Sequence, residues 1–476
     1  MAEKRIVIVG GGITGLAAAY AATKRARETG QAAQVTVLER SLRLGGSIVT
    51  ERIDGFLMDG GPDSWVTSKP HATALARELG LEHALTGTNE ANRRYYVAWN
   101  NRLYAVPEGL VLGVPTRFAP LARSHLFSLR GKARMAVEPF VSAKPWDGDD
   151  DESIADFVTR RLGREAAERL VAPLLGGISS GDASEISIRA TFPQLVAMER
   201  EYGSLVRGMW AAARLRKTGS QQGAEASAFL SLGGGVGELV TTLVDRLREA
   251  NVSLRTSAPA CGLDRLERNG GWTVHLESGD PIAADAVLLA VPAHVAARLV
   301  GTLHEDLSRA LASIAHGSTA TVFLAYRRDD VAHPLDGVGF VVPPALGRAI
   351  LAGTWVSSKW PGRAPAGHVL LRAFLGGARH EEVLRLDDGA LASLARDELR
   401  ALMGLAAEPL WSRVFRFEAA RPQMRVGHLA TIRAIRVHLA TALTGVWIAG
   451  DGYDGAGIPD CIRQGQEAGG AMVRPS

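Results

Sequence analysis

Three glycines with the spacing G-x-G-x-x-G stand near the start of the chain, at Gly10, Gly12 and Gly15. The first permits a tight turn, the second leaves room for a diphosphate, and the third lets a helix approach a strand closely. A helix that begins at such a turn presents free N–H groups and a positive dipole end to phosphates. The spacing therefore indicates a dinucleotide site built mainly from backbone.

The segments around this loop have the order that such a site requires. Residues 4–9 read KRIVIV, a β-branched run that suits a buried parallel strand, and residues 16–28 predict a helix that stops at Gly30. A second strand is predicted over residues 34–38, and Glu39 follows it at the distance expected of the carboxylate that accepts ribose hydroxyls. Strand, loop, helix, strand and acid together predict a nucleotide-binding unit.

Composition excludes several classes of protein. The 476 residues suggest about three domain-sized masses. The net charge of +4 is too small for a nucleic-acid binder, and two cysteines cannot form a disulfide framework. The longest uncharged apolar stretch, about residues 286–297, is too short to span a membrane. With no leader pattern at its start, the chain is predicted to be cytoplasmic.

Three more motifs follow the glycine loop: residues 39–46 read ERSLRLGG, residues 59–62 read DGGP, and residues 446–451 read VWIAGD. Together they resemble motifs of the flavoproteins with two dinucleotide-binding domains, the superfamily of amine oxidases and phytoene desaturases. The resemblance implies FAD, bound non-covalently with one per chain. Residues 232–238 lack the last glycine of a second fingerprint, and we interpret them as a tight turn beside the flavin.

Four further motifs lie at residues 454–462 (DGAGIPDCI), 61–64 (GPDS), 187–193 (SIRATFP) and 337–343 (GVGFVVP). They resemble motifs of the oxygen-dependent porphyrinogen oxidases of haem synthesis. The resemblance implies oxidation of protoporphyrinogen IX or coproporphyrinogen III, or both, with O2 as acceptor and H2O2 as product. A methylene bridge of the macrocycle must lie over flavin N5 for hydride transfer. The sequence does not decide between the two substrates.

The same resemblance assigns individual contacts. Arg94 matches the arginine that meets a propionate, with Arg93 as an alternative one place away, and Gly339 and Val341 match residues that pack on the macrocycle. Strand alternation predicts that Phe340 points to the opposite face. We identify no protein base and predict no metal site. The expected FAD contacts are Gly10, Gly11, Gly12, Ile13, Thr14, Gly15, Glu39, Arg40, Gly45, Gly46, Gly61, Pro62, Asp63, Ser64, Ala260, Asp451, Ala456, Gly457 and Ile458.

Two single residues have both a chemical and a structural interpretation. Cys461 lies near a predicted helix N-terminus, which can lower a thiol pKa, but a small buried residue beside the flavin is the favoured interpretation. His294 is interpreted as structural. Two functional alternatives stay open: another amine-oxidase-like flavoprotein, either a polyamine or amino-acid oxidase or a carotenoid desaturase, and a non-catalytic FAD-bound porphyrin carrier.

We therefore expect an α/β + α protein with a Rossmann-like FAD domain, a mixed-sheet substrate domain and a helical insertion. The FAD domain is expected over 1–85, 230–300 and 440–476, the substrate domain over 86–105 and 300–440, and a mostly helical domain over 106–228. Basic and apolar residues alternate over 117–135, which fits peripheral contact with an anionic membrane at its inner face or an ordinary solvated helix. A second copy of the chain and a ferrochelatase are left open as protein partners.

Overall fold

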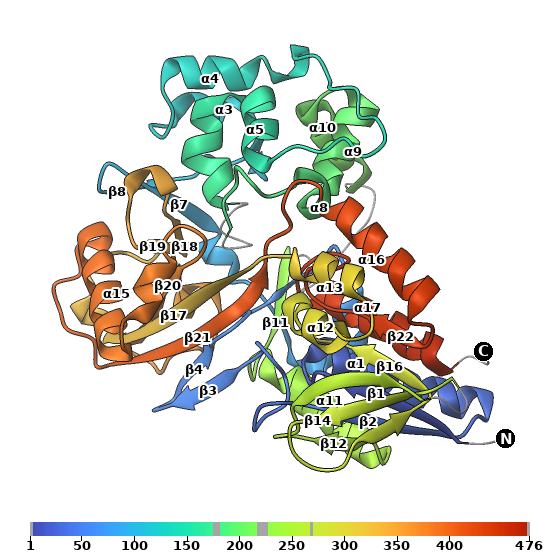
Figure 1. Cartoon of the computed structure of the whole chain (residues 1–476). Helices are drawn as coiled ribbons and strands as arrows, with labels where there is room; N and C mark the ends of the chain where they lie inside the picture. The colour runs from blue at the N-terminus through green and yellow to red at the C-terminus, as the bar shows by residue number, and fades with distance from the viewer. Residues whose placement is uncertain (1–2, 175–180, 217–226, 267–269, 474–476) are drawn as a thin grey trace.

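The computed structural model describes residues 3–174, 181–216, 227–266 and 270–473. Three masses are visible in Figure 1: a parallel sheet with its helices near both termini, a second sheet beside it, and a helical part above them. Residues from distant parts of the sequence meet in each mass. The segments that build the site therefore come together only through the tertiary fold.

The sheet nearest the termini has five parallel strands in the order β12-β2-β1-β16-β22. Its central strand β1 is buried on both faces: Ile6 and Ile8 belong to one hydrophobic cluster, and Val7 and Val9 belong to another. This burial explains the unbroken β-branched run at the start of the chain. The strands are β1 (Lys4–Val9), β2 (Ala33–Leu38), β12 (Ser253–Arg255), β16 (Ala286–Leu289) and β22 (Val446–Ile448).

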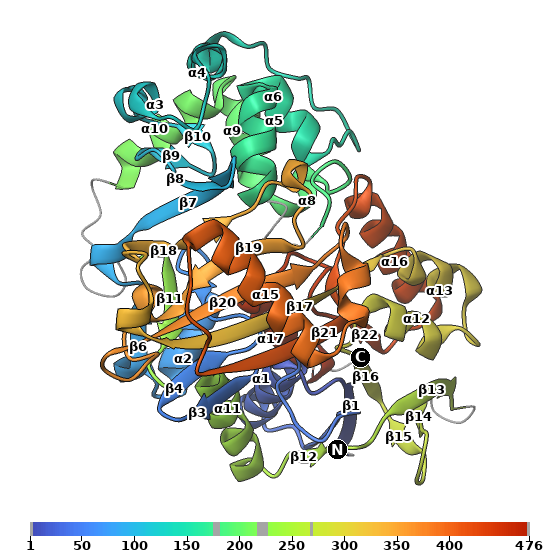
Figure 2. The ribbon, with the colours of Figure 1, turned by 90° about the vertical axis from the view of Figure 1, so that its left-hand side faces the viewer.

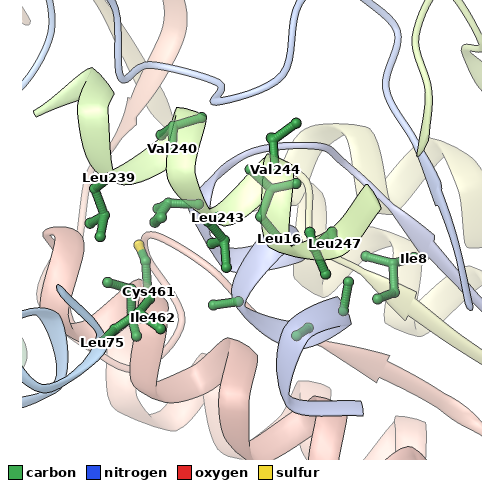
Figure 3. Packing of buried hydrophobic residues seen from close by; sticks show 14 of the residues in the cluster. Ile8, Leu16, Leu75, Leu239, Val240, Leu243, Val244, Leu247, Cys461 and Ile462 are labelled. Atoms are coloured by element: carbon green, nitrogen blue, oxygen red, sulfur yellow. The ribbon is translucent and has the colours of Figure 1, made fainter. Parts of the chain in front are cut away.

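Helices cover both faces of this sheet. Figure 3 shows the apolar stripe of α11 packed over Leu16 and Ile8, with Cys461 and Ile462 of α17 beside them. The opposite face is covered by three helices and by a small antiparallel sheet, β13-β14-β15. The first layer contains α1 (Ile13–Thr29), α2 (His71–Glu78), α11 (Gly237–Glu249) and α17 (Ile458–Val473); the second contains α12 (Ala293–Val300), α13 (Glu305–Ala312), α16 (His428–Ala442), β13 (Ala260–Arg265), β14 (Trp272–Leu276) and β15 (Ile282–Ala284).

Helices α1 and α17 pack unusually closely. A Cβ atom placed on Gly465 would lie 2.3 Å from the carbonyl oxygen of Thr14, and one on Gly469 would lie 2.2 Å from that of Ala18. Only glycine fits at these positions, because any side chain would collide with the backbone of α1. The close packing brings the N-terminal ends of both helices to the same region.

The second sheet has seven strands in the order β21-β17-β20-β19-β18-β7-β8. It is mixed, because β7 and β18 pair in parallel while the other neighbours are antiparallel. Helix α15 (Asp388–Met403) packs on one face, as Figure 2 shows. The strands are β7 (Arg94–Trp99), β8 (Arg102–Ala105), β17 (His316–Arg327), β18 (Gly337–Val341), β19 (Ile350–Trp355), β20 (His368–Gly376) and β21 (Trp411–Pro422).

The helical part has a hydrophobic cluster of its own and lies against the end of β7 and β18 (Figure 2). Its interior also contains a fully buried ion pair between Arg161 and Glu138, to which Ser204 donates a further hydrogen bond. Its elements are α3 (Phe118–Arg123), α4 (Leu129–Ala136), α5 (Ile154–Leu162), α6 (Arg164–Ala166), the π-helix η4 (Ala167–Val171), α8 (Ile188–Thr191), α9 (Pro193–Tyr202), α10 (Leu205–Arg216), β9 (Leu110–Val111) and β10 (Val114–Pro115).

Two small antiparallel sheets stand on either side of the DGGP turn in the sequence. Strands β3 (Thr50–Ile53) and β4 (Phe56–Asp59) form a hairpin that ends at the DGGP turn, and β5 (Trp65–Val66), β11 (Phe229–Leu232) and β6 (Leu85–Gly87) form a small sheet after it. The predicted strand 4–9 is confirmed at both ends, and the predicted strand 34–38 begins one residue earlier, at Ala33. The predicted helix 16–28 is longer, because α1 extends from Ile13 to Thr29, and it ends at Gly30 as expected.

Candidate active site

The glycine loop has the geometry that each glycine was expected to provide. Gly10 has a φ of +111°, and a Cβ on Gly15 would lie 1.9 Å from the carbonyl oxygen of Gly10. Beside Gly12, in contrast, a Cβ would meet nothing closer than Gly46, at 3.9 Å. Gly12 is also the N-cap of α1 and has no side chain with which to cap the free N–H groups of the first turn. The open space beside Gly12 therefore fits a diphosphate.

The second half of the nucleotide region is held against this loop. Glu39 is buried and accepts hydrogen bonds from the backbone N–H of Gly11 at 2.9 Å and from the hydroxyl of Ser41 at 2.6 Å. Gly45 donates its N–H to the carbonyl of Gly11 at 2.8 Å. Arg40 is exposed, and Ala260 begins β13 close to Glu39, whose carbonyl accepts from the N–H of Ala258. Gly46, the residue after Gly45, lies beside Gly12: a Cβ on Gly46 would be 3.1 Å from the Cα of Gly12.

The DGGP turn is held from behind by a buried arginine. Arg372 of β20 is 3% exposed and donates to the carbonyl oxygens of Gly60 at 2.6 Å and Gly61 at 2.7 Å. The hydroxyl of Thr321 also donates to Gly60. Burial lowers the pKa of Arg372 to about 10 against the opposing effect of Asp63. Both carbonyls therefore have donors within the protein, and these hydrogen bonds fix the orientation of the turn.

Asp59 and Asp63, the aspartates on either side of this turn, lie in different electrostatic environments. Asp63 accepts from the Nζ of Lys359 at 2.8 Å and from the indole of Trp360 at 3.0 Å, while Ser64 donates to its other oxygen at 2.7 Å. Burial opposes ionisation, but the charges of Lys359 and Arg372 outweigh it and hold the pKa of Asp63 below its ordinary value. Both oxygens of the Asp63 side chain therefore have donors within the protein. Pro62 precedes it and is partly buried.

Asp59 holds the tight turn at residues 232–238 in place through a hydrogen bond. Its Oδ1 accepts from the backbone N–H of Val236 at 2.9 Å and from the hydroxyl of Thr50, and its Oδ2 pairs with buried Arg363 at 3.0 Å. Burial raises the pKa of Asp59, and Arg363 offsets part of that rise. The turn continues directly into α11 at Gly237. The contacts attach this segment to the base of the DGGP turn.

Asp451 has a carboxylate oxygen that lacks a partner. Its Oδ1 is enclosed and accepts no hydrogen bond from the described residues. Burial raises the pKa of Asp451 to about 6, although the charge of Arg421 and the N–H groups of Gly452 and Gly457 act against the rise. An enclosed acceptor with no donor is costly unless a ligand supplies one. A sugar-alcohol chain that carries hydroxyl groups fits this oxygen.

The start of α17 lies next to Asp451. Ala456 and Gly457 are exposed, whereas Ile458, the first residue of the helix, is buried. Cys461 is buried as well, and burial raises its thiol pKa, so the alternative of an activated thiol is not supported. The exposed backbone at the helix start can receive a polar group of a cofactor.

The seven-stranded sheet presents one face to the helical part and the other to α15. Val341 packs toward the helical part, and Phe340 lies in the cluster under α15, which confirms the predicted alternation. A Cβ on Gly339 would lie 2.1 Å from the carbonyl oxygen of Gly353. Tyr95, the register partner of Gly339 on β7, shares the face of Val341 and is 43% exposed. This face carries the residues expected to pack on a macrocycle.

The two candidate arginines at the start of β7 both have intramolecular partners. Arg94 is 67% exposed and pairs with Asp336 at 2.5 Å, and the hydroxyl of Tyr96 donates to the same carboxylate. Strand alternation therefore places Arg94 on the α15 face, with Tyr96. Arg93 precedes the strand and pairs with Glu90 at 2.8 Å. An incoming carboxylate must compete with an acid at either arginine.

A cavity of about 410 Å³ lies between the helical part and the far end of the sheet. Its walls are mostly apolar and include Val342, Pro343 and Ala183, and Arg379 and Arg348 stand at its edge. Arg379 pairs with Asp182 at 2.8 Å across the two masses, and Arg348 pairs with Glu398 at 2.7 Å. Val342, the residue after Val341, is one of the residues that line this cavity.

Sequence reasoning missed several residues of this region. Arg372, Lys359 and Thr321 lie far along the chain from the turn that they hold, and no local motif marks them. His294 contacts His316 with ring centroids 4.8 Å apart, and burial lowers its pKa, which agrees with a structural role. Among the residues that the structure describes, no group of three His, Cys, Asp or Glu side chains is placed to hold a metal ion.

The chain belongs to the family of flavin-containing amine oxidoreductases, whose pattern matches residues 13–473. It is therefore a flavin-dependent oxidoreductase, and the expected α/β + α fold, with a Rossmann-like part, a mixed-sheet substrate part and a helical insertion, is confirmed. The open space beside Gly12 and the unpartnered oxygen of Asp451 are compatible with such a cofactor.

The chain is also similar to individual proteins over most of its length. The chain is 37% identical to coproporphyrinogen III oxidase of Bacillus subtilis over 98% of this chain and 97% of that protein. It is 29% identical to protoporphyrinogen oxidase 1, chloroplastic, of Arabidopsis thaliana, over 97% and 86%. A crystal structure of a putative protoporphyrinogen oxidase from Exiguobacterium sp. 255-15 superposes with a TM-score of 0.86 at 31% identity and covers 99% of both chains.

Proposed function

We propose that this protein oxidises a porphyrinogen, protoporphyrinogen IX or coproporphyrinogen III or both, to the porphyrin in haem biosynthesis. The observation that carries the proposal is the identity of 37% to a coproporphyrinogen III oxidase along nearly the whole of both chains. Removal of six hydrogens in three flavin cycles would reduce three O2 to three H2O2, so that electrons and protons balance. The apolar face beside Val341 and its adjoining cavity are consistent with a large flat substrate.

We propose FAD, one per chain and non-covalent, as the cofactor, held by the residues around the glycine loop, the DGGP turn and the start of α17. FAD, when bound, accepts a hydride from the substrate and passes the electrons to oxygen. The first turn of α1 would bind the diphosphate, and Glu39 the ribose. Asp451 would accept from the ribityl chain through its free oxygen. The segments 1–85, 230–300 and 440–476 would form the FAD domain, 86–105 and 300–440 the substrate domain, and 106–228 the helical domain.

Protein residues would position the substrate rather than exchange protons with it. Gly339 and Val341 would pack on the macrocycle, and Arg94 or its neighbour Arg93 would meet a propionate at the rim. Tyr95 is added to this face by the structure, next to Gly339 in the register. Burial raises the pKa of Tyr95, so its hydroxyl stays protonated at neutral pH and can donate a hydrogen bond.

The decisive experiment mixes the holoenzyme with coproporphyrinogen III or protoporphyrinogen IX without oxygen. Either substrate should bleach the flavin absorbance, and after air is admitted three H2O2 should form per porphyrin. Bleaching by polyamines, amino acids or a carotenoid precursor, with none by porphyrinogens, would favour another amine-oxidase-like enzyme. Porphyrin binding without bleaching would favour a carrier. Steady-state rates on both porphyrinogens would then establish the preferred substrate.

The binding mode of the cofactor is tested separately. Protein that is denatured and precipitated should release its yellow colour to the supernatant, with one FAD per chain by absorbance. Flavin that stays with the pellet would contradict non-covalent binding.

No helix in the described ranges is both long and apolar enough to cross a bilayer.

We also propose peripheral contact between the helical part and an anionic bilayer, at the cytoplasmic face of the membrane. Leu129 and Phe140 are each 82% exposed, and Val137 between them is 47% exposed. Arg130 and Arg123 are exposed nearby on α4 and α3. Apolar groups flanked by cations suit an anionic interface, where each basic residue contributes about 1 kcal/mol.

The membrane proposal predicts sedimentation with anionic vesicles at low salt and release as ionic strength rises. Leu129→Ser combined with Phe140→Ser should abolish sedimentation while leaving turnover in detergent-free buffer unchanged. Equal sedimentation with neutral and anionic vesicles would contradict the proposal. A second copy of the chain and a ferrochelatase are proposed protein partners, to be tested by native mass spectrometry of each mixture.

A further inference from the structure

Arg421 occupies a central position between the two halves of the candidate site. It lies near the end of β21, opposite Gly317 of β17. Earlier in the same strand, Phe415 and Phe417 contact the DGGP turn: a Cβ on Gly60 would lie 2.5 Å from the Phe415 ring, and one on Gly61 would lie 3.6 Å from Phe417. Strand β21 thus runs along the turn that faces the cofactor region.

The residue after Arg421 reaches the other half of the site. A Cβ on Gly452 would lie 2.5 Å from the ring of Pro422, so the side chain next to Arg421 packs against the loop that carries Asp451. The charge of Arg421 lowers the pKa values of Asp451 and Arg372, which places its guanidinium near both. Arg421 therefore stands between the DGGP turn, the Asp451 loop and the open face of the sheet.

The guanidinium of Arg421 has no hydrogen-bond or ion-pair partner within the described residues, although the residue is partly buried. Other arginines of the described chain that are not fully exposed, such as Arg348, Arg363 and Arg372, donate to carboxylates or carbonyls. A partly desolvated cation without a partner is costly, because it loses water and gains no hydrogen bond in return. A ligand that supplies the missing acceptor would remove this cost.

The acids in the neighbourhood are occupied by other cations. Asp63 pairs with Lys359, Asp59 pairs with Arg363, and Asp460 pairs with Lys69 at 2.6 Å. Asp451 is close to Arg421, but the two side chains form no hydrogen bond in the described part of the chain, and the free oxygen of Asp451 is enclosed. An anionic group delivered from the open face is the complement that the site lacks.

We propose that Arg421 receives a carboxylate arm of the bound tetrapyrrole, opposite the rim arginines at the start of β7. The inference rests on the proposed function and adds a second cation to the substrate site. A guanidinium binds a carboxylate through two parallel hydrogen bonds, which would fix the rotation of the macrocycle as well as its affinity. The diphosphate of the cofactor is assigned to the first turn of α1, so it does not need this cation.

The test compares a charged ligand with its uncharged form. Coproporphyrin III and its tetramethyl ester are titrated into the oxidised holoenzyme, and binding is followed by flavin or porphyrin fluorescence. Arg421→Met should weaken binding of the acid about ten- to a hundredfold and leave binding of the ester unchanged. Arg421→Lys should recover part of the loss, because a point charge cannot reproduce the fork. The Michaelis constant should rise more than turnover falls.

The matched control is Arg425→Met, which removes an arginine from the same segment. Arg425 is paired with Glu185 at 3.1 Å and its side chain is 56% exposed, so neither ligand should be affected. FAD content and the flavin midpoint potential of Arg421→Met should equal those of the parent.

Three results would overturn the inference. They are equal weakening of acid and ester, no change for either ligand, and loss of flavin or a shifted potential in Arg421→Met, which would assign the cation to the cofactor. A parent enzyme that neither binds coproporphyrin III nor oxidises a porphyrinogen would instead contradict the proposed function itself.

Discussion

The nucleotide side and the substrate side of the candidate site are built on different principles. Around Gly12 the surface that faces the ligand is backbone: free N–H groups of α1, an exposed helix start at Gly457, and glycines in place of side chains. On the seven-stranded sheet the ligand would meet side chains, among them Val341 and Tyr95. Backbone recognition needs a fixed local geometry, whereas side-chain recognition needs long-range assembly.

From this difference we expect the two sides to respond differently to substitution. A side chain added to the glycine loop either collides with the protein, as at Gly15, or fills the space that the ligand needs, as at Gly12. A side chain changed on the sheet face removes one contact and leaves the strand intact. Loss of binding is therefore expected to be complete on the first side and graded on the second.

The largest effect is expected from Gly12→Val. The new side chain has room in the protein, because a Cβ there meets nothing closer than 3.9 Å, but it occupies the expected position of the diphosphate. The variant should fold, with a far-ultraviolet spectrum like the parent, and purify without yellow colour. Gly15→Ala is the contrast: its Cβ would lie 1.9 Å from a backbone oxygen, so it should lose stability. A folded, yellow Gly12→Val would place the nucleotide elsewhere.

A graded effect is expected on the substrate side from Arg94→Ala. The Michaelis constant for a porphyrinogen should rise about tenfold with a smaller fall in turnover, since a rim contact contributes equally in ground and transition states. This tenfold rise is at the lower end of the range for loss of a charge-assisted pair, because the Arg94 side chain is 67% exposed and already pairs with Asp336.

Arg93→Ala is measured beside it. Strand alternation groups Arg94 with Tyr96 on the α15 face, so a defect in Arg93→Ala with a normal Arg94→Ala would assign the propionate to the earlier residue. If neither variant changes the kinetics, the rim of β7 does not bind the substrate. Arg94→Lys should restore only part of the affinity if the contact is bidentate.

The same contrast determines what the sequence could predict. The strand at 4–9, the helix that ends at Gly30 and the loop between them are continuous in the chain, and β-branched residues and glycine spacing specify them locally. Arg372 lies more than three hundred residues from Gly60, and only the pairing of β20 in the seven-stranded sheet brings them together. No periodicity marks an arginine in a buried strand as a partner of a distant turn.

Resemblance supplied part of what periodicity could not. It identified Asp451, whose enclosed free oxygen is visible only in three dimensions, and it selected Gly339 and Val341 on a strand whose register the sequence does not specify. It did not indicate Arg421 or Tyr95, because their environment depends on a bulge near Gly317 and on the parallel pairing of β7 with β18. For both residues, the environment depends on contacts between segments that are far apart in the sequence, and local sequence patterns do not specify such contacts.

A pH effect of about tenfold is expected on the nucleotide side from Asp451. Its pKa of about 6 in the structure is raised by burial, so the folded protein without flavin binds a proton more readily than the unfolded chain and loses stability as pH rises from about 4 through 6. Ribityl hydroxyls that donate to the ionised carboxylate would lower this pKa again. FAD affinity of the apoprotein should therefore rise about tenfold between about pH 5 and 7.

Asp451→Asn is the control for this pH effect. The amide does not titrate, so the FAD affinity of that variant should be weaker and independent of pH across the same range. An equal pH dependence in the parent and in Asp451→Asn would show that another group titrates, and a falling affinity with rising pH would contradict the proposed role of the carboxylate.

The smallest effect is expected from Cys461→Ala, the side chain on the nucleotide side that sequence reasoning considered for chemistry. Cys461 lies on the buried face of α17, and burial raises its thiol pKa, so it carries no thiolate at neutral pH. The variant should keep its flavin and its turnover within about twofold and lose about 1 kcal/mol of unfolding free energy from a smaller side chain. A native-state thiol reagent should modify exposed Cys261 alone. Rapid labelling of Cys461, or a large loss of turnover in Cys461→Ala, would show that a side chain acts where the structure assigns recognition to backbone.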